Sequence, residues 1–253
     1  MPLASIAAFL QELRHTWQAG SLCTAVSGLR AFLRVTENGR RLLPAVPGHW
    51  LRKRTILPIL TPGEEQRIWA VLQTAALSSR DKALMTLALL TGLRAVDLLA
   101  LKLRDIDWQS DVIRLIQKKT QTPLVLPLLP AMGNALAQYI AQDRPPSASP
   151  WVFLSAQAPY HPLQGHASCY AIVRKVLTCA GVRLGHELKG TRLLRHHVAS
   201  NMLRHGVALP TISSTLGHVN PETTNIYLTT DEEALRDCAA TLTLIPMQVE
   251  ALR

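Results

Sequence analysis

The stretch of residues 192–227 constrains the fold most, because it sets basic and imidazole side chains into the apolar pattern of a helix. Arg195 lies in that helix, and Gly206 can end it. A Leu-Gly pair before His218 ends a second helix, and Tyr227 follows a short helix that begins at a proline. We expect these cations, the imidazole and the phenol to gather around a phosphate.

The charge balance points to a polyanionic partner. The 253 residues include 27 Lys and Arg against 17 Asp and Glu, which gives a net charge of +10. Eight basic and two acidic residues fall within residues 1–60, so this part carries +6 of the total. We therefore expect a small basic N-terminal unit and a nucleic-acid partner in preference to a membrane.

Four cysteines are scattered along the chain without a C-x-x-C pair, and no segment resembles a signal peptide or a membrane span. This usage predicts reduced thiols in the cytoplasm. His161, His166 and Cys169 offer metal-ligand chemistry, but they occupy an expected loop with no matching second pair. No metal site is therefore predicted.

Two amphipathic helices are expected at the N-terminus, the first over residues 4–17. Ser21 can cap the second helix, and Asn38-Gly39 stops it. Arg30 and Arg34 fall one turn apart on its exposed side, where they can contact DNA.

Residues 40–60 contain three prolines and the basic cluster Arg52-Lys53-Arg54, without a sustained hydrophobic period. This composition predicts a linker that can follow a phosphate backbone. The chain is therefore divided into a small basic helical domain with its linker, residues 1–57, and a larger domain, residues 58–253.

The larger domain is predicted to be mainly α with a small antiparallel β-sheet, an α+β fold. A capping box at Thr61 starts a helix over residues 64–77, and another helix is expected over residues 80–90. A break at Thr91-Gly92 then puts Arg94 at the N-terminus of the next helix. A guanidinium placed there has an anionic partner, which is either a ligand or Asp97 three residues later.

Two segments rich in branched residues, VIRLIQ and TPLVLPL, predict a β-hairpin with Lys118 and Lys119 near its tip. Lysines on a turn also serve solubility. Further helices are expected over residues 130–142 and 167–180, and WVFL, residues 151–154, predicts a short strand or an extended segment.

These motifs resemble those of the tyrosine recombinases, or phage integrases, over residues 61–227. TGLRAVDLLALKLRDID resembles the first arginine box, with Arg94 in the catalytic position. IQKKTQTPLVLP resembles the lysine hairpin, in which Lys119 is the better match and Lys118 the second. LLRHHVASNML, HG, TLGH and TTNIY resemble the second box, with Arg195, His218 and Tyr227 at its functional positions.

The resemblance implies an integrase-like catalytic domain preceded by a small helical DNA-binding domain, here short for the family. Tyr227 would attack a DNA phosphorus and form a 3′-phosphotyrosine, while Arg94, Arg195 and His218 hold the phosphate oxygens. Lys119 would protonate the departing 5′ oxygen. This chemistry needs no metal and no cofactor. The resemblance also implies a bacterial, cytoplasmic protein that acts on double-stranded DNA. It would act as a homotetramer or together with related recombinases, and the tail after Tyr227 would make contacts between protomers.

One position departs from the family pattern. Arg192 stands where the pattern has histidine, three residues before the second arginine. A guanidinium, with a pKa above about 12, donates hydrogen bonds to phosphate but cannot accept the proton of tyrosine. Arg192 is therefore assigned to phosphate binding, and His186 is an alternative source of the missing imidazole.

Three other functions remain open at this stage. One is a DNA-binding relative of recombinases that no longer cleaves, which Arg192 would explain. Another is a type IB topoisomerase, which shares the tyrosine chemistry. A third is a helix-turn-helix regulator, because the helices around Leu194 to Leu216 resemble such a motif.

Overall fold

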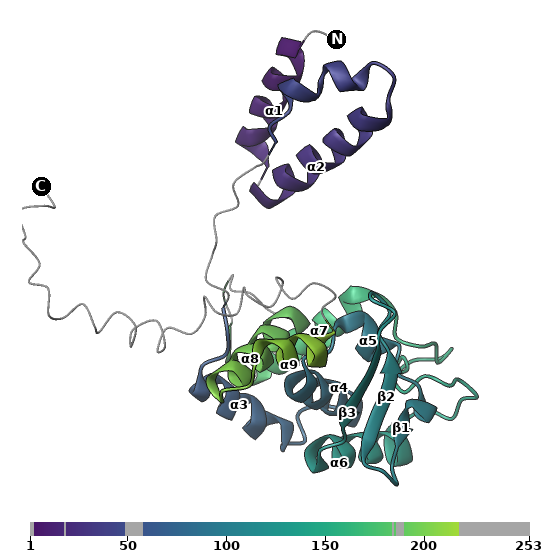
Figure 1. Cartoon of the computed structure of the whole chain (residues 1–253). Coiled ribbons are helices and arrows are strands. Elements are labelled where there is room, and N and C mark those ends of the chain that lie inside the picture. The colour runs from purple at the N-terminus through teal and green to yellow at the C-terminus, as the bar shows by residue number, and fades with distance from the viewer. Residues whose placement is uncertain (1–2, 18, 49–57, 184, 186–189, 218–253) are drawn as a thin grey trace, which may run out of the picture. The chain divides into compact units, whose positions relative to one another are not determined.

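The chain forms two compact units, residues 1–55 and residues 56–253. A computed structural model describes residues 3–17, 19–48, 58–183, 185 and 190–217 (Figure 1). No described helix is both long and apolar enough to cross a lipid bilayer.

In the part of the N-terminal unit that the structure describes, two helices are followed by two 3-10 turns (Figure 1). These are α1 (Leu3–Thr16), α2 (Ala19–Val35), η1 (Gly39–Arg41) and η2 (Leu43–Ala45). A small core holds them together, formed by Ile6, Leu10, Val26, Leu33 and Val46. Its size is modest, as expected for so short a unit.

Two predictions for this unit are wrong in detail. Helix α2 begins at Ala19, so Ser21 lies inside its first turn and is not the N-cap. The linker was expected from residue 40, but residues 39–45 form the two 3-10 turns, and Val46 is buried against the helices. The apolar residues of this segment explain the difference, because they complete a core that two helices alone cannot close.

The second unit is mainly helical with one three-stranded sheet, which confirms the predicted fold class. Its elements are α3 (Pro62–Leu72), α4 (Ser79–Thr91), α5 (Ala95–Leu99), η3 (Leu103–Asp105), β1 (Ile106–Asp107), β2 (Val112–Ile116), β3 (Pro123–Pro127), α6 (Pro130–Gln138), the π-helical turn η4 (Tyr139–Asp143), α7 (Gly165–Cys179), α8 (Thr191–Arg204) and α9 (Leu209–Leu216). The predicted capping box is present, with Thr61 N–H donating to Glu64 Oε2 at 2.8 Å.

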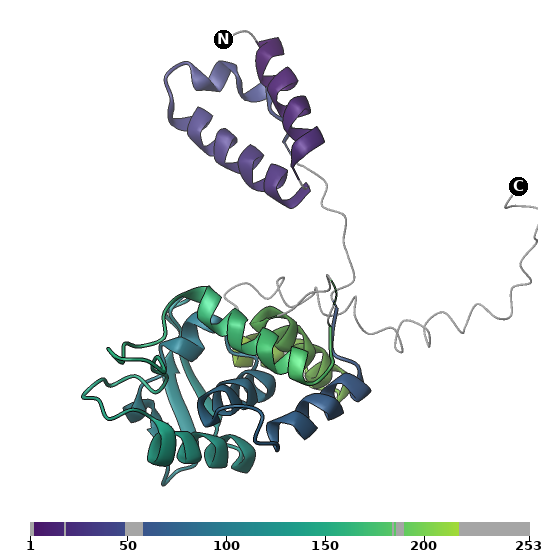
Figure 2. The same ribbon diagram turned by 180° about the vertical axis from the view of Figure 1, so that it is seen from behind.

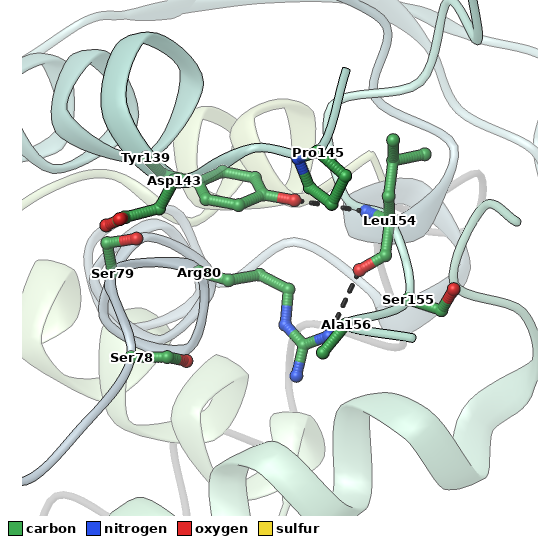
Figure 3. Close-up of a pocket in the computed structure, with 9 residues that line it drawn as sticks. All are labelled: Ser78, Ser79, Arg80, Tyr139, Asp143, Pro145, Leu154, Ser155 and Ala156. Carbon is green, nitrogen blue, oxygen red and sulfur yellow. Dashed lines mark hydrogen bonds between the residues drawn. The ribbon is translucent and has the colours of Figure 1, made fainter. Parts of the chain in front are cut away.

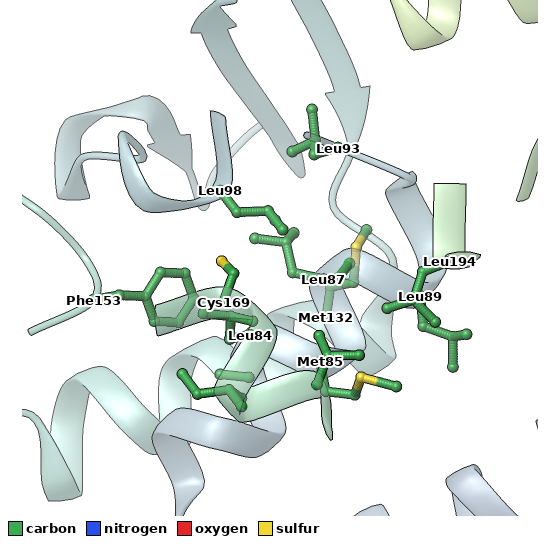
Figure 4. Packing of buried hydrophobic residues seen from close by; sticks show 14 of the residues in the cluster. Leu84, Met85, Leu87, Leu89, Leu93, Leu98, Met132, Phe153, Cys169 and Leu194 are labelled. Atoms are coloured by element: carbon green, nitrogen blue, oxygen red, sulfur yellow. The ribbon is translucent and has the colours of Figure 1, made fainter. Parts of the chain in front are cut away.

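Helix α4 is the central element of this unit. Apolar side chains surround it, and it is buried along nearly its whole length. It packs against α6, α7 and α8, and Figure 4 shows Leu84, Met85 and Leu87 among the side chains of that core. Seen from behind, α7 lies on the side of this unit that faces the viewer (Figure 2). Each fully buried leucine here contributes about 1.5–3 kcal/mol.

The sheet is antiparallel in the order β1-β2-β3, which confirms the predicted hairpin. Ile113 pairs with Leu126 and Leu115 with Leu124, and all four side chains face the core. Helix α5 lies at one end of β2 and β3, and α6 lies at the other (Figure 1). The hairpin turn that carries the two lysines therefore comes next to α5.

Two other boundaries differ from the sequence prediction. Helix α3 ends at Leu72, five residues early, and the Thr74 hydroxyl donates to the carbonyl of Val71 at 2.8 Å. The helix expected over residues 130–142 changes to a π-helical turn after Gln138. WVFL forms two isolated bridges, at Trp151 and at Leu154, which agrees with the extended segment expected there as the alternative to a strand.

Candidate functional site

A basic cavity of about 500 Å³ opens on the second unit. Four segments distant in sequence line it, and their side chains are Arg94, Ala95, Val96, Lys118, Lys119, His166, Thr191, Arg192 and Arg195. Five of these residues are cationic, and no carboxylate lines the cavity among the residues that the structure describes. The cavity is therefore strongly electropositive, and we call it the basic pocket.

The break between α4 and α5 positions Arg94. Helix α4 ends at Gly92, whose φ of +61° suits glycine, and Arg94 is the N-cap residue of α5 as predicted. The Arg94 side chain is only 19% exposed. Its guanidinium donates to Gln117 Oε1 at 3.3 Å and to the carbonyl oxygen of Gly217 at 3.1 Å. These bonds fix the guanidinium at the wall of the basic pocket.

Asp97 is shared between Arg94 and the hairpin. Its carboxylate lies 4.0 Å from Nη1 of Arg94, and its Oδ1 accepts a hydrogen bond from the backbone N–H of Lys118 at 2.7 Å. The side chain of Asp97 is fully buried. The ion pair between Arg94 and Asp97, one of the two partners that the sequence suggested for Arg94, is therefore present at the long distance of 4.0 Å. Among described residues no acceptor is bonded to Nε of Arg94, so this N–H can meet a ligand.

Arg195 lies on the buried side of α8. Its guanidinium donates to the carbonyl oxygen of Gly92 at 3.0 Å and to that of Leu216 at 2.7 Å. The residue is 7% exposed, and burial of a cation is costly unless such acceptors surround it. Both acceptors are carbonyls at helix ends, where the helix dipole favours a positive charge.

The carbonyl of Leu216, at the end of α9, is the common acceptor of the site. It accepts from Arg195 Nη2 at 2.7 Å, from Gln117 Nε2 at 3.2 Å and from Arg94 Nη1 at 3.5 Å. Gly217 follows in the left-handed conformation, with φ +63°. The end of α9 therefore holds both arginines on the same side of the basic pocket.

The two lysines extend from the hairpin turn into the mouth of the basic pocket. Lys118 and Lys119 are both exposed, and both line the cavity. The turn is closed by a hydrogen bond from Gln117 N–H to the carbonyl of Thr122 at 3.0 Å. A lysine on such a turn keeps a mobile ammonium, which suits proton transfer as well as phosphate binding.

Arg192 is exposed at the first turn of α8 and lines the basic pocket. His196 and His197, one turn further along α8, are buried. Burial, together with Arg192 and Arg195, lowers the pKa of His196 to about 4, so its imidazole is neutral at pH 7. Burial also lowers the pKa of His197 in spite of Glu65, whose Oε2 lies 3.3 Å from Nε2. Both histidines belong to the packing of α8.

In the N-terminal unit the two arginines of α2 differ. Arg30 is half-buried, and its Nη1 donates to the carbonyl of Val46 at 2.8 Å, so it ties the segment after α2 to the helix. Arg34 is exposed. The expectation that both lie on one exposed side is therefore wrong for Arg30.

Several predicted residues lie outside the described part of the chain. These are His218 and Tyr227, the linker cluster Arg52, Lys53 and Arg54, and the alternative imidazole His186. The tail after Tyr227, which was expected to make contacts between protomers, lies outside as well. Gly217, the neighbour of His218, is the last described residue.

A second cavity, of about 280 Å³, lies at the N-terminus of α4 (Figure 3). Arg80 Nη1 donates to the carbonyl of Leu154 at 3.0 Å, and the Tyr139 hydroxyl accepts from the Leu154 N–H at 3.2 Å. Arg80 is also paired with Asp81 at 3.0 Å. These bonds tie residues 151–156 to α4 and η4. The lining mixes Arg80 with Asp143, which gives the cavity no single sign of charge.

Sequence reasoning missed two side chains of the site. His166 lines the basic pocket from the start of α7, whereas the sequence suggested it only as a metal ligand. Gln117 is fully buried beneath the two arginines. A signal for Gln117 was available, because Ile113, Leu115 and Gln117 alternate along the inward face of β2. Among the described residues no group of three His, Cys, Asp or Glu is placed to hold a metal ion.

Comparison with known proteins covers most of the chain. The sequence profile of the phage integrase family matches residues 58–234. The protein y4rF of Sinorhizobium fredii, provisionally named an integrase/recombinase, is 32% identical over 242 residues, which are 92% of this chain and 56% of y4rF. The tyrosine recombinase XerC of Staphylococcus haemolyticus is 27% identical over 234 residues, which are 90% of this chain and 75% of XerC.

The fold is also found among solved structures. The XerH site-specific recombinase, in a post-cleavage complex with its palindromic difH substrate, superposes with a TM-score of 0.71 at 17% identity. The superposition covers 95% of this chain and 72% of that structure. The likeness extends over nearly all of the chain, although the chain spans little more than half the length of y4rF.

Proposed function

The chain belongs to the phage integrase family, the tyrosine recombinases, and from this membership we propose that it is a site-specific DNA strand transferase. It cuts and rejoins double-stranded DNA through a 3′-phosphotyrosyl link on Tyr227. The observation that carries the proposal is the basic pocket, in which Arg94 and Arg195 are held rigidly beside Arg192 and the two hairpin lysines.

The geometry fits the charge that develops during attack on a phosphodiester. As the bond to phosphorus forms, negative charge gathers on the non-bridging oxygens, and rigid guanidinium groups stabilise that charge without reorganising. Arg94 and Arg195 are fixed by carbonyl acceptors before any substrate arrives. Each arginine can donate paired hydrogen bonds to phosphate oxygens. Arg192, on the open side of the basic pocket, adds a third guanidinium.

The proton transfers are assigned to separate groups. The Tyr227 oxygen bonds to phosphorus while the P–O5′ bond breaks, and Lys119 gives a proton to the departing O5′. The cations of the basic pocket favour the ionised phenol, whose pKa is otherwise near 10, so Tyr227 loses its proton to solvent before its oxygen attacks. His218 donates a further hydrogen bond to the phosphate. The phosphotyrosine conserves the energy of the broken bond, so rejoining needs no metal or nucleotide cofactor.

DNA binding is assigned to both units. Residues 1–57 form a core-binding-like domain in which Arg34 and the linker cluster Arg52, Lys53 and Arg54 contact phosphates. Lys118 contacts the backbone beside the cleavage site. Arg30 is assigned a structural role instead, because its guanidinium is used within the unit. Affinity would then depend steeply on salt concentration.

The active assembly is proposed to be a homotetramer on two duplexes, or a mixed assembly with related recombinases, in the bacterial cytoplasm. The tail after Tyr227 would make contacts between protomers. XerH is described in complex with its difH substrate, which supports DNA as the partner of this fold.

Covalent capture tests the proposal and identifies the DNA site in the same experiment. The full chain is incubated with a pool of nicked duplexes that carry a randomised segment, and adducts that survive SDS are sequenced. Cleavage beside a nick releases a short strand, so the adduct accumulates. The wild type should enrich one sequence, whereas Tyr227→Phe should bind the same sequence in a gel shift but form no adduct.

The same assay separates the other candidate functions. If the wild type forms no more adduct than Tyr227→Phe, strand transfer is ruled out and a DNA-binding protein remains. Relaxation of a supercoiled plasmid without the enriched sequence would favour a type IB topoisomerase. Arg192→His should form at least as much adduct as the wild type, because the imidazole can also accept a proton.

A further inference from the structure

Gln117 is a buried polar residue to which the proposed function gives no role. It follows the last residue of β2, on the inward face of the strand, and it has no exposed surface. Burial of an amide is unfavourable unless its donor and acceptor groups are satisfied. The position next to Ile113 and Leu115 would suit an apolar side chain if packing were the only requirement.

The Gln117 amide connects three parts of the site. Its Oε1 accepts from Arg94 Nη1 at 3.3 Å and from the Thr120 hydroxyl at 2.9 Å. Its Nε2 donates to the Leu216 carbonyl at 3.2 Å, which also accepts from Arg195. One side chain thus bonds to the first arginine, to the lysine turn and to the acceptor shared by both arginines.

The backbone of Gln117 closes the same turn. Its N–H donates to the Thr122 carbonyl at 3.0 Å, and its carbonyl accepts from the Gln121 N–H at 2.8 Å. Lys118 and Lys119 lie in the turn that these two hydrogen bonds close. The position of both lysines relative to the arginines is therefore set by the residue that precedes them.

The fit between Gln117 and the end of α9 is specific. A Cβ on Gly217 would lie 1.7 Å from Gln117 Oε1, so only glycine allows the amide to approach this closely. A glutamate at position 117 would lose the N–H donor to Leu216 and place a carboxylate against a carbonyl. The site requires a group that donates on one side and accepts on the other, which the carboxamide provides.

We propose that Gln117 is a positioning residue that sets Lys119 relative to the arginine pair without contacting DNA itself. The proposal rests on the proposed strand transfer and deepens it. Lys119 must reach O5′ as the P–O5′ bond breaks, and a shift of about 1 Å in such a group lowers rates by about 100-fold. Loss of the Gln117 amide should therefore impair the proton transfer to the leaving group.

A change of leaving group tests this role. When sulfur replaces O5′ at the scissile bond, the P–S bond breaks and the sulfur departs as a thiolate. The thiolate needs no proton from Lys119, because a thiol is a much stronger acid than an alcohol, with a pKa of about 8.5. The probe is a nicked duplex of the sequence recovered by covalent capture, made with oxygen or with sulfur at that position. Single-turnover adduct formation by the full chain is measured at saturating DNA.

Gln117→Met removes the hydrogen bonds and keeps the volume. We expect its rate on the oxygen substrate to fall by about 10–100-fold, with DNA affinity unchanged, and most of that loss to disappear on the sulfur substrate. Lys119→Met lacks the proton donor altogether, so the recovery of its rate on the sulfur substrate defines full recovery. Gln138→Met makes the same chemical change at an exposed position of α6, and its rate should stay within about two-fold of the wild type on both substrates.

The possible results separate the role from the proposed function. Equal losses on both substrates, or an unchanged oxygen rate, would overturn the positioning role of Gln117 while leaving strand transfer intact. A parallel loss of folding, seen as a lowered Tm with weakened DNA binding, would overturn it as well, since the residue would then be merely structural. Absence of adduct from the wild type on both substrates would instead overturn strand transfer, and the role with it.

Discussion

Substitution of Gly217 by alanine probes the close contact on which the site is built. The residue has φ +63°, and the three atoms nearest to an added Cβ all belong to Gln117, at 1.7, 2.2 and 2.4 Å. The left-handed backbone costs a residue with a Cβ about 1–2 kcal/mol. Displacement of a buried side chain adds about 1–3 kcal/mol. We therefore expect Gly217→Ala to lower the free energy of unfolding by about 2–5 kcal/mol.

A double-mutant cycle isolates the steric part of that cost. In a Gln117→Ala background the atoms that meet the new Cβ are gone, so Gly217→Ala should cost only the backbone part, about 1–2 kcal/mol. The coupling energy should then be about 1–3 kcal/mol. Gly63→Ala is the matched control, because nothing lies within 4 Å of its Cβ and helix propensity favours the change.

Urea unfolding of the full chain, followed by the fluorescence of Trp69, Trp108 and Trp151 in the second unit, gives these free energies. Additive costs in the cycle, with a coupling energy near zero, would refute the contact between the amide and the end of α9. A cost for Gly217→Ala below about 1 kcal/mol would refute it too, since the backbone part alone reaches that value.

Two further predictions concern other parts of the chain. Burial alone would raise the pKa of Glu64, but the Thr61 N–H and the Arg183 guanidinium, which is 2.9 Å away, lower this pKa on balance. The Glu64 carboxylate therefore stabilises the fold above pH 4.5, and this contribution is lost as the pH falls through its folded pKa. Arg183→Met should cost about 2–3 kcal/mol at pH 7 and flatten the acid limb of urea unfolding, and an unchanged acid limb would contradict this account. In the N-terminal unit, Arg30→Met should speed hydrogen exchange in α2 about 5–30-fold, because the bond to the Val46 carbonyl is lost. Arg34→Met should leave this exchange unchanged and should reduce the salt dependence of DNA binding. Equal exchange rates in the two variants would contradict the assigned roles.

Sequence patterns with a local cause predicted the fold well. The capping box at Thr61 and the stop at Gly92 depend on a few neighbouring residues, and both lie where the pattern placed them. The branched residues of VIRLIQ and TPLVLPL predicted the hairpin for the same reason. The start of α2 and the end of α3 were less accurate, because tertiary packing and turn side chains decide where a helix begins and ends.

The site could be predicted only where side chains carry the chemistry. Arg94 and Arg195 stand out as charges in apolar surroundings, and the structure brings them to one pocket. Their acceptors are backbone carbonyls, those of Gly92 and Leu216 among them, and a carbonyl leaves no mark in a sequence. The link through Gln117 depends on α9 reaching β2 across about 100 residues, which only the tertiary fold reveals.

The nucleophile is the central claim, and locating the covalent bond tests it most directly. The adduct formed by the wild type on the captured sequence is digested with nuclease and protease, and the nucleotide-bearing peptide is identified by mass spectrometry. The account predicts one modified residue, Tyr227, joined to a 3′-phosphate, and no modified peptide from Tyr227→Phe. A nucleotide on any other side chain, or an adduct that persists in Tyr227→Phe, would contradict it.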